Sequence, residues 1–103
     1  MIRAVFRGEP DAYRGFEISG HAGYEEAGRD IVCAAVSSSA ILTANTVTDV
    51  FFIGADASET DGRLTLALTE ESTIASGLIA GLLAHLEAIA EQYPDRIKII
   101  TEV

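Results

Sequence analysis

The segment from Ile31 to about Val50 contains neither glycine nor proline, and it is dense in Ala, Ser, Thr and Val. Its β-branched residues lower the intrinsic helix propensity. A segment of this length without a chain breaker nevertheless favours one buried helix over a strand. Small residues on this helix are expected to let a sheet or another helix approach closely, namely Ala34, Ser37, Ser38 and Asn45.

The residues before this helix have strand periodicity. Within Ile2 to Arg7, one face holds Ile2, Ala4 and Phe6, and the other holds Arg3, Val5 and Arg7. In the stretch from about Tyr13 to Ser19, Phe16 and Ile18 alternate with the polar residues Glu17 and Ser19. The residues between them, Gly8 to Asp11, are typical of a turn. The two strands are therefore predicted to pair as a hairpin.

The second half of the chain repeats this order. Phe51–Ser58 and Arg63–Thr69 read as strands, and the Asp61-Gly62 pair between them is a hairpin turn signal. Glu70 and Glu71 lie where acidic residues favour the start of a helix.

A second helix is indicated by apolar residues at helical spacing, namely Ile74, Leu78, Leu82, Leu83, Leu86, Ile89 and Ala90. Pro94 cannot continue this helix, and Ile97–Val103 reads as a last strand. The element order is therefore ββαββαβ. We predict an α+β fold in which residues 1–103 form a single domain, a two-layer sandwich with two helices packed on a mostly antiparallel sheet. The strand order stays open.

The charge balance limits the partners of the chain. Sixteen acidic against seven basic residues give the 103-residue chain a formal net charge of -9. Such a surface repels phosphate backbones, so no direct binding to nucleic acid is expected. Basic partners would be attracted instead, although acidity also simply keeps a small protein soluble.

Composition also bears on location. One cysteine cannot form an internal disulfide, which excludes a disulfide-stapled secreted fold. The N-terminal residues lack a signal-peptide pattern. No apolar run is expected to reach the length of a membrane span, because His85 and Glu87 interrupt the second helix. The cytoplasm is the expected location.

The candidate catalytic residues lie at or just before the start of the first predicted helix. His21 follows a predicted strand, and Cys33 falls in the first turn of the helix if Asp30 caps it. A thiol attacks a carbonyl as its thiolate, which helix N-termini and neighbouring cations stabilise. His21 is placed to protonate the leaving amine, and backbone N–H groups near Cys33 and Ala34 to form an oxyanion hole.

Simpler interpretations stay open for each of these residues. Cys33 could be an inert buried thiol, His21 a surface residue, and Asp30 only a helix cap. The remaining histidine, His85, is read as structural. One cysteine and two histidines without tight spacing do not make a zinc set, so no metal is expected. The Gly20–Gly23 stretch is not a phosphate loop, because no Gly-Lys-Ser/Thr follows.

Two neighbouring stretches resemble the signature of a known family, the ribosomal-processing cysteine proteases called Prp or YsxB-like. The stretches are Gly20-His21-Ala22-Gly23-Tyr24 and Gly28-Arg29-Asp30-Ile31-Val32-Cys33-Ala34-Ala35-Val36-Ser37. The resemblance extends over the chain. It includes the opening strand pair, the Asp61-Gly62 hairpin and Glu91-Gln92-Tyr93-Pro94 before the last strand.

The resemblance implies a small cytoplasmic homodimeric endopeptidase of bacteria. It would remove the N-terminal extension of a basic large-subunit ribosomal protein, without a cofactor. The family's nucleophile falls on Cys33, its proton donor on His21 and its aspartate on Asp30. The substrate loop falls on Gly20, Ala22, Gly23, Tyr24, Glu25, Glu26 and Gly28.

Two further expectations concern the basic substrate and an alternative function. Glu25, Glu26, Glu70 and Glu71 are candidates to attract basic residues flanking the cleaved bond. The alternative function is a non-enzymatic dimeric binding protein of ribosome assembly, in which Cys33 is only a buried helix residue.

Overall fold

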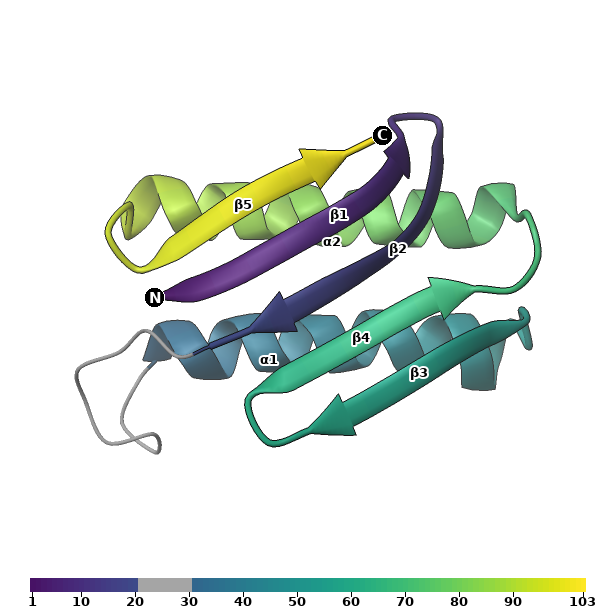
Figure 1. The fold of residues 1–103 in the computed structure, drawn as a ribbon, viewed down its shortest axis with the longest axis horizontal. Helices are drawn as coiled ribbons and strands as arrows, with labels where there is room; N and C mark the ends of the chain where they lie inside the picture. Colours follow the sequence, from purple (N-terminus) through teal and green to yellow (C-terminus); the bar gives the residue numbers. More distant parts are fainter. Residues whose placement is uncertain (21–30) are drawn as a thin grey trace.

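The computed structural model describes residues 1–20 and 31–103 (Figure 1). Its elements follow the predicted ββαββαβ order, with a short π-helical turn, η2, continuing the first helix. In chain order they are β1 (Ile2–Glu9), β2 (Ala12–Ser19), α1 (Ile31–Asn45), η2 (Thr46–Val50), β3 (Ala55–Thr60), β4 (Arg63–Leu68), α2 (Thr73–Gln92) and β5 (Ile97–Glu102).

The five strands form one sheet in the order β3-β4-β2-β1-β5. All neighbouring pairs are antiparallel except β1 and β5, which run parallel. Both helices cover the same face of the sheet, with α2 behind β1 and β5 and α1 behind β3 and β4 (Figure 1). The predicted two-layer α+β sandwich with a mostly antiparallel sheet is therefore confirmed.

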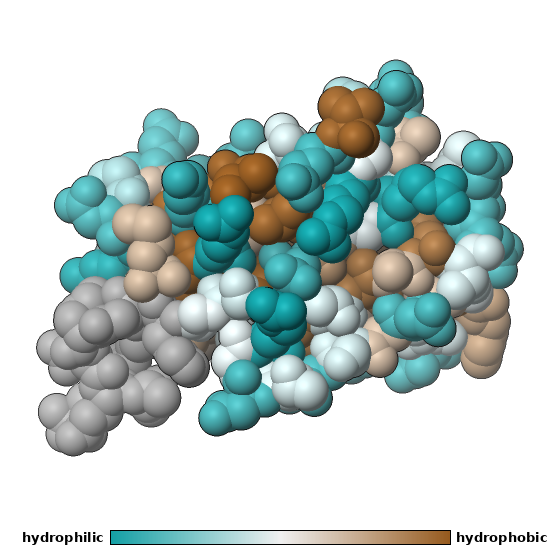
Figure 2. Space-filling view, in the orientation of Figure 1, coloured by the Kyte–Doolittle hydropathy of each residue, from teal (hydrophilic) through white to brown (hydrophobic). Residues whose placement is uncertain are grey.

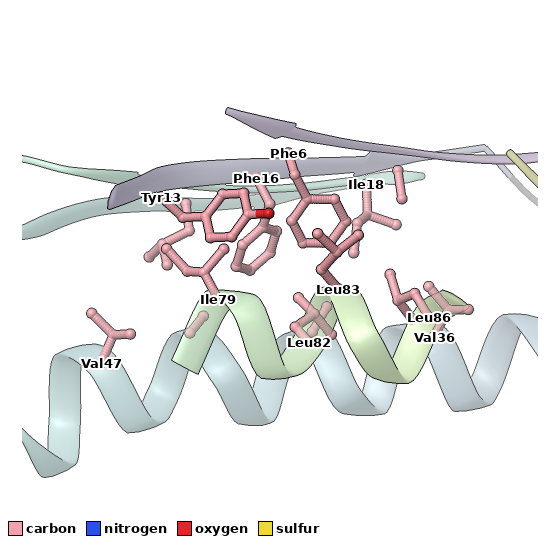
Figure 3. Packing of buried hydrophobic residues seen from close by; sticks show 14 of the residues in the cluster. Phe6, Tyr13, Phe16, Ile18, Val36, Val47, Ile79, Leu82, Leu83 and Leu86 are labelled. Carbon is pink, nitrogen blue, oxygen red and sulfur yellow. The ribbon is translucent and has the colours of Figure 1, made fainter. Parts of the chain in front are cut away.

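The core lies between the sheet and the two helices (Figure 3). Phe6 and Phe16 oppose each other across β1 and β2, with ring centroids 6.1 Å apart. Val36 from α1 and Leu86 from α2 are also fully buried in this layer. Burial of such side chains stabilises the fold by about 1.5–3 kcal/mol each.

The other face of the sheet is exposed. Figure 2 views this side, and hydrophilic side chains cover much of it with apolar ones scattered between them. Arg7 and Glu102 form an ion pair of 3.4 Å, and Arg63 and Glu17 form one of 3.7 Å. Exposed pairs of this kind contribute little stability, about 0–1 kcal/mol, so the sheet is held mainly through its helix-facing side.

The third strand begins later than the sequence predicts, at Ala55 rather than Phe51. Phe51 keeps a helical backbone, and its N–H donates to the carbonyl of Thr46. Phe52 then adopts a positive φ of 52° with its side chain 82% exposed. The chain turns at these residues, so they are not available for strand pairing.

The faces of both helices also differ from expectation. The small residues expected to let a sheet or another helix approach closely are all exposed and do not face the sheet, namely Ala34, Ser37, Ser38 and Asn45. The residues that pack inward on α1 are Val32, Val36, Ala40 and Ala44. On α2, Ile74 is half exposed, and the helix begins after Ser72, whose hydroxyl accepts from the Ala75 N–H at 3.0 Å.

Two described helical segments are long and apolar enough to span a bilayer by length and composition alone, Ile31–Val50 and Thr73–Gln92. The expectation that no apolar run reaches that length was therefore wrong. Each segment packs one side against the sheet, which accounts for part of its apolar content. The side turned away from the sheet is also poor in charge, because α1 carries no charged residue.

Candidate functional site

Cys33 lies in the first turn of α1, as the sequence predicts. Its neighbour Val32 is buried in the core, and Cys33 itself packs partly against that core. Cys33 is half-buried rather than enclosed, and it lines a hollow of about 150 Å³ at the protein surface. The thiol is thus held on a rigid element at the wall of a small open pocket.

The hollow lies between α1 and the hairpin formed by β3 and β4. Ser37 and Ile41 continue the α1 wall at successive turns beyond Cys33. Glu59 and Leu64 form part of the opposite wall, and they face each other across β3 and β4. The buried residues Ile18 and Ala40 also line the hollow. A mostly apolar lining with a few polar groups is typical of a pocket that binds a ligand.

Gly20 also lines this hollow. It has a φ of 84°, and its N–H donates to the carbonyl of Gly62 in the β3–β4 turn at 3.0 Å. A Cβ at this position would lie 2.6 Å from the carbonyl oxygen of Met1. Only glycine combines this backbone angle with so close an approach. The end of β2 is therefore fixed beside the thiol.

The other residues of the predicted site lie outside the described residues. They are His21, Ala22, Gly23, Tyr24, Glu25, Glu26, Gly28 and Asp30. The Cys33–His21 pair, the capping role of Asp30 and the substrate loop thus stay predictions. Among the described residues, no group of three or more His, Cys, Asp and Glu side chains could hold a metal ion.

Glu70 and Glu71 do not flank Cys33. Both line a separate hollow of about 470 Å³ next to the connection between β4 and α2. This connection and the β3–β4 turn lie at opposite ends of the molecule (Figure 1). The Glu70 carboxylate accepts from the Gly54 N–H at 2.7 Å, so it has a structural role there. The expected grouping of these two acids around the cleaved bond is wrong, because the β4 strand carries them away from the thiol.

Glu59 is the acidic residue near Cys33 that sequence reasoning missed. The sequence placed it in the hairpin turn, whereas β3 extends through Thr60 and makes Glu59 a strand residue. Its partner Leu64 belongs to the helix-facing series of β4, so Glu59 shares that face. In the sequence, Ala55, Ala57 and Glu59 alternate and so share one face of a strand. Which face of the sheet they occupy depends on how β3 pairs with β4, and the sequence does not show that pairing.

The second histidine, His85, lies on α2 and is not among the residues that line this hollow. It is exposed and lines a groove of about 370 Å³ between the two helices, together with Leu42, Leu78 and Gly81. This histidine therefore does not contribute to the hollow that contains Cys33.

Comparison with known proteins gives consistent matches. The family model described as cysteine protease Prp matches residues 1–98. A Bacillus subtilis (strain 168) protein described as ribosomal processing cysteine protease Prp is 31% identical over 111 residues. That alignment covers 100% of this chain and 99% of the relative.

Two solved structures share the fold. One is the ribosomal processing protease Prp from S. aureus in complex with a covalently linked product peptide, with a TM-score of 0.86 and 23% identity over 98% of this chain and 99% of that one. The other is SMU.848 from Streptococcus mutans, with a TM-score of 0.78 and 27% identity over 99% of this chain and 94% of that one.

Proposed function

This chain belongs to the cysteine protease Prp family, and from that premise we propose that Cys33 is its nucleophile and His21 its proton donor. One observation carries the assignment. A cysteine protease needs a reactive thiol, and Cys33 is the only cysteine in the chain. It lines an open hollow in the first turn of a helix. Gly20 lines the same hollow, and His21 is the next residue in the sequence.

The proposed reaction has two steps. In the first, the Cys33 thiolate attacks the carbonyl carbon of the peptide bond, and His21 gives a proton to the leaving amine. In the second, water attacks the carbonyl carbon of the thioester, and the C–S bond breaks to release the acid product and the Cys33 thiolate. The proton that the water loses restores the protonated His21. Backbone N–H groups in the first turn of α1 stabilise the oxyanion in both steps. Asp30 orients His21 or caps α1.

The proposed substrate is a large-subunit ribosomal protein that carries a cleavable N-terminal extension. Two observations support it: the B. subtilis relative is described as a ribosomal processing enzyme, and a net charge of -9 favours a basic protein over nucleic acid. Ribosomes are assembled in the cytoplasm, where we therefore place the enzyme. The alternative of a non-enzymatic assembly protein is disfavoured, because Cys33 lines an open hollow rather than lying fully buried.

The decisive experiment incubates the purified protein with the host's ribosomal protein bearing its N-terminal extension and measures the intact mass over time. We expect one cleavage that releases the extension. Cys33→Ala protein serves as the control, since it lacks the thiol. No cleavage of a protein with an extension, or equal cleavage by the control, would reject this function.

We further propose that the enzyme is a homodimer whose two copies meet through the outer face of the helix layer. Leu42 is 67% exposed on α1, and Ile74 is 52% exposed on α2. Gly77 and Gly81 lie on the exposed side of α2, with open space where a Cβ would be. Glycine inside a helix costs about 1 kcal/mol relative to alanine, a cost that a closely packed partner helix would offset.

The size and charge of this face suit a second copy. At 1.5 Å per residue, α1 and α2 are about 22 and 30 Å long, and side by side they offer about 500 Å² per copy. A pair of such faces buries about 1,000 Å², near the lower limit for a specific interface. Each chain carries a charge of -9, so two copies repel each other least where few charges face one another. The α1 half of this face carries no charged residue.

A further inference from the structure

The hollow beside Cys33 continues along α1 as a groove. A second hollow of about 160 Å³ adjoins it, and the two share Ile41, Glu59 and Leu64. Asn45 lies at the far end of the second hollow. The groove therefore runs from Cys33 to Asn45, with α1 on one side and the β3–β4 hairpin on the other.

The dimensions of this groove match an extended peptide. Cys33 and Asn45 are a little over three helical turns apart, which is about 18 Å along the axis. An extended chain advances about 3.3 Å per residue, so the groove accommodates about five residues. β3 is an edge strand of the sheet, and one of its backbone edges is therefore not paired with another strand. A peptide lying here has main-chain donors and acceptors to pair with.

Glu59 gives this groove its charge. Of the described residues that line the two hollows, Glu59 and Arg63 are the charged ones. Arg63 lies opposite Thr60 and Ser19 in the sheet and is 3.7 Å from the Glu17 carboxylate. Glu59 lies on the helix-facing side instead, and it borders both hollows. The groove thus presents a carboxylate at its midpoint.

We propose that Glu59 is a specificity-determining residue, which binds a lysine or arginine side chain of the substrate close to the cleaved bond. Ile41, at the junction of the two hollows, is about 12 Å along α1 from Cys33, which corresponds to three or four residues of extended peptide. The basic side chain therefore lies within four residues of the bond that Cys33 attacks. This inference rests on the proposed proteolytic function.

The test uses synthetic peptides that span the cleavage junction of the host's ribosomal protein. In each peptide, one of the four positions on either side of the cleaved bond carries either lysine or the uncharged norleucine. We expect the wild-type enzyme to prefer lysine at one position by about three- to fivefold in kcat/KM, as a partly exposed ion pair allows. Glu59→Gln should remove that preference, and Glu59→Lys should favour glutamate at the same position.

Asp56→Asn is the matched control. It removes one acidic charge from the same strand, but Asp56 pairs with Ala67 on the sheet face turned away from the groove. We expect it to keep the lysine preference. An unchanged preference in Glu59→Gln, or an equal loss in Asp56→Asn, would overturn the assignment of Glu59.

A binding measurement separates this inference from the proposed function. Fluorescence anisotropy with the Cys33→Ala protein reports affinity for labelled peptides without any cleavage. Weaker binding of the lysine peptide by the Cys33→Ala, Glu59→Gln double variant would support the Glu59 subsite even if no peptide were cleaved. Equal binding would reject the subsite even if cleavage occurred.

Discussion

The backbone N–H of Gly20 donates a 3.0 Å hydrogen bond to the carbonyl oxygen of Gly62, which ties the end of β2 to the β3–β4 turn. Both glycines line the hollow that contains Cys33. The bond therefore fixes two walls of the proposed active site relative to each other. It also fixes the point from which the chain continues to His21.

Gly20→Ala should destabilise the fold and reduce activity. A φ of 84° costs a residue with a Cβ about 1–2 kcal/mol, and the added carbon would lie 2.6 Å from the Met1 carbonyl oxygen. We expect a lower midpoint in urea denaturation and a lower kcat/KM for peptide cleavage. Ser19→Ala, one residue earlier, is the control and should change both values little. A Gly20→Ala enzyme with wild-type stability would contradict this account.

Cys33→Ala should abolish cleavage while keeping the fold. Alanine is a good helix former, and removal of one half-buried sulfur should cost about 1–2 kcal/mol of unfolding free energy. Circular dichroism checks the fold, and mass spectrometry checks cleavage. Proteolysis by the purified variant would show that Cys33 is not the nucleophile.

His21→Ala should lower kcat by about 10²–10⁴-fold, the usual effect of losing a general acid–base group. It should also slow the alkylation of Cys33 by iodoacetamide near neutral pH, if the imidazolium helps to hold the thiolate. His85→Ala is the matched control, because it removes the other histidine, which lies on the outer side of α2. Equal alkylation rates in the wild type and both variants would leave His21 without a role at the thiol.

Leu42→Glu should convert the proposed dimer to a monomer. The side chain is 67% exposed on the outer face of α1, and two glutamates per interface would bury charge without a partner. Sedimentation velocity at micromolar concentration checks this result. Val103→Glu makes the same apolar-to-acidic change at a residue 95% exposed beyond β5, and it should leave the dimer intact.

Sedimentation velocity of the wild type also tests whether a second copy of the chain binds the outer face of the helix layer. A wild-type monomer in sedimentation would reject the second copy as its occupant. Cosedimentation of that monomer with phospholipid vesicles, measured separately, would then indicate a membrane as the partner of this face.

The elements and the position of the thiol followed from local patterns. Alternation predicted β1 and β2, the Asp61-Gly62 pair predicted the β3–β4 hairpin, and Pro94 marked the end of α2. The placement of Cys33 in the first turn of a helix followed from the unbroken run after Asp30. These features depend on residues that are close in sequence, and periodicity and turn chemistry report on such neighbours directly.

The errors arose where a distant partner decided the outcome. Glu70 looked like a residue that could accompany Cys33, yet β4 places it at the other end of the sheet, where it binds the Gly54 N–H. Phe51 and Phe52 have strong strand propensity, but η2 continues the helix to Val50 and leaves them in the turn that follows. Propensity is a weak guide when tertiary packing sets where an element ends.

The element order, the single thiol and the acidic charge all follow from the amino-acid sequence, because each is a property of composition or of near neighbours. The tertiary structure alone decided the strand order, the Gly20–Gly62 hydrogen bond and the position of Glu59 in a groove with Cys33. These depend on which strands pair and in which register. A shift of one residue in register would turn Glu59 to the opposite face of the sheet, and only long-range packing of the apolar face against the helices selects between the two.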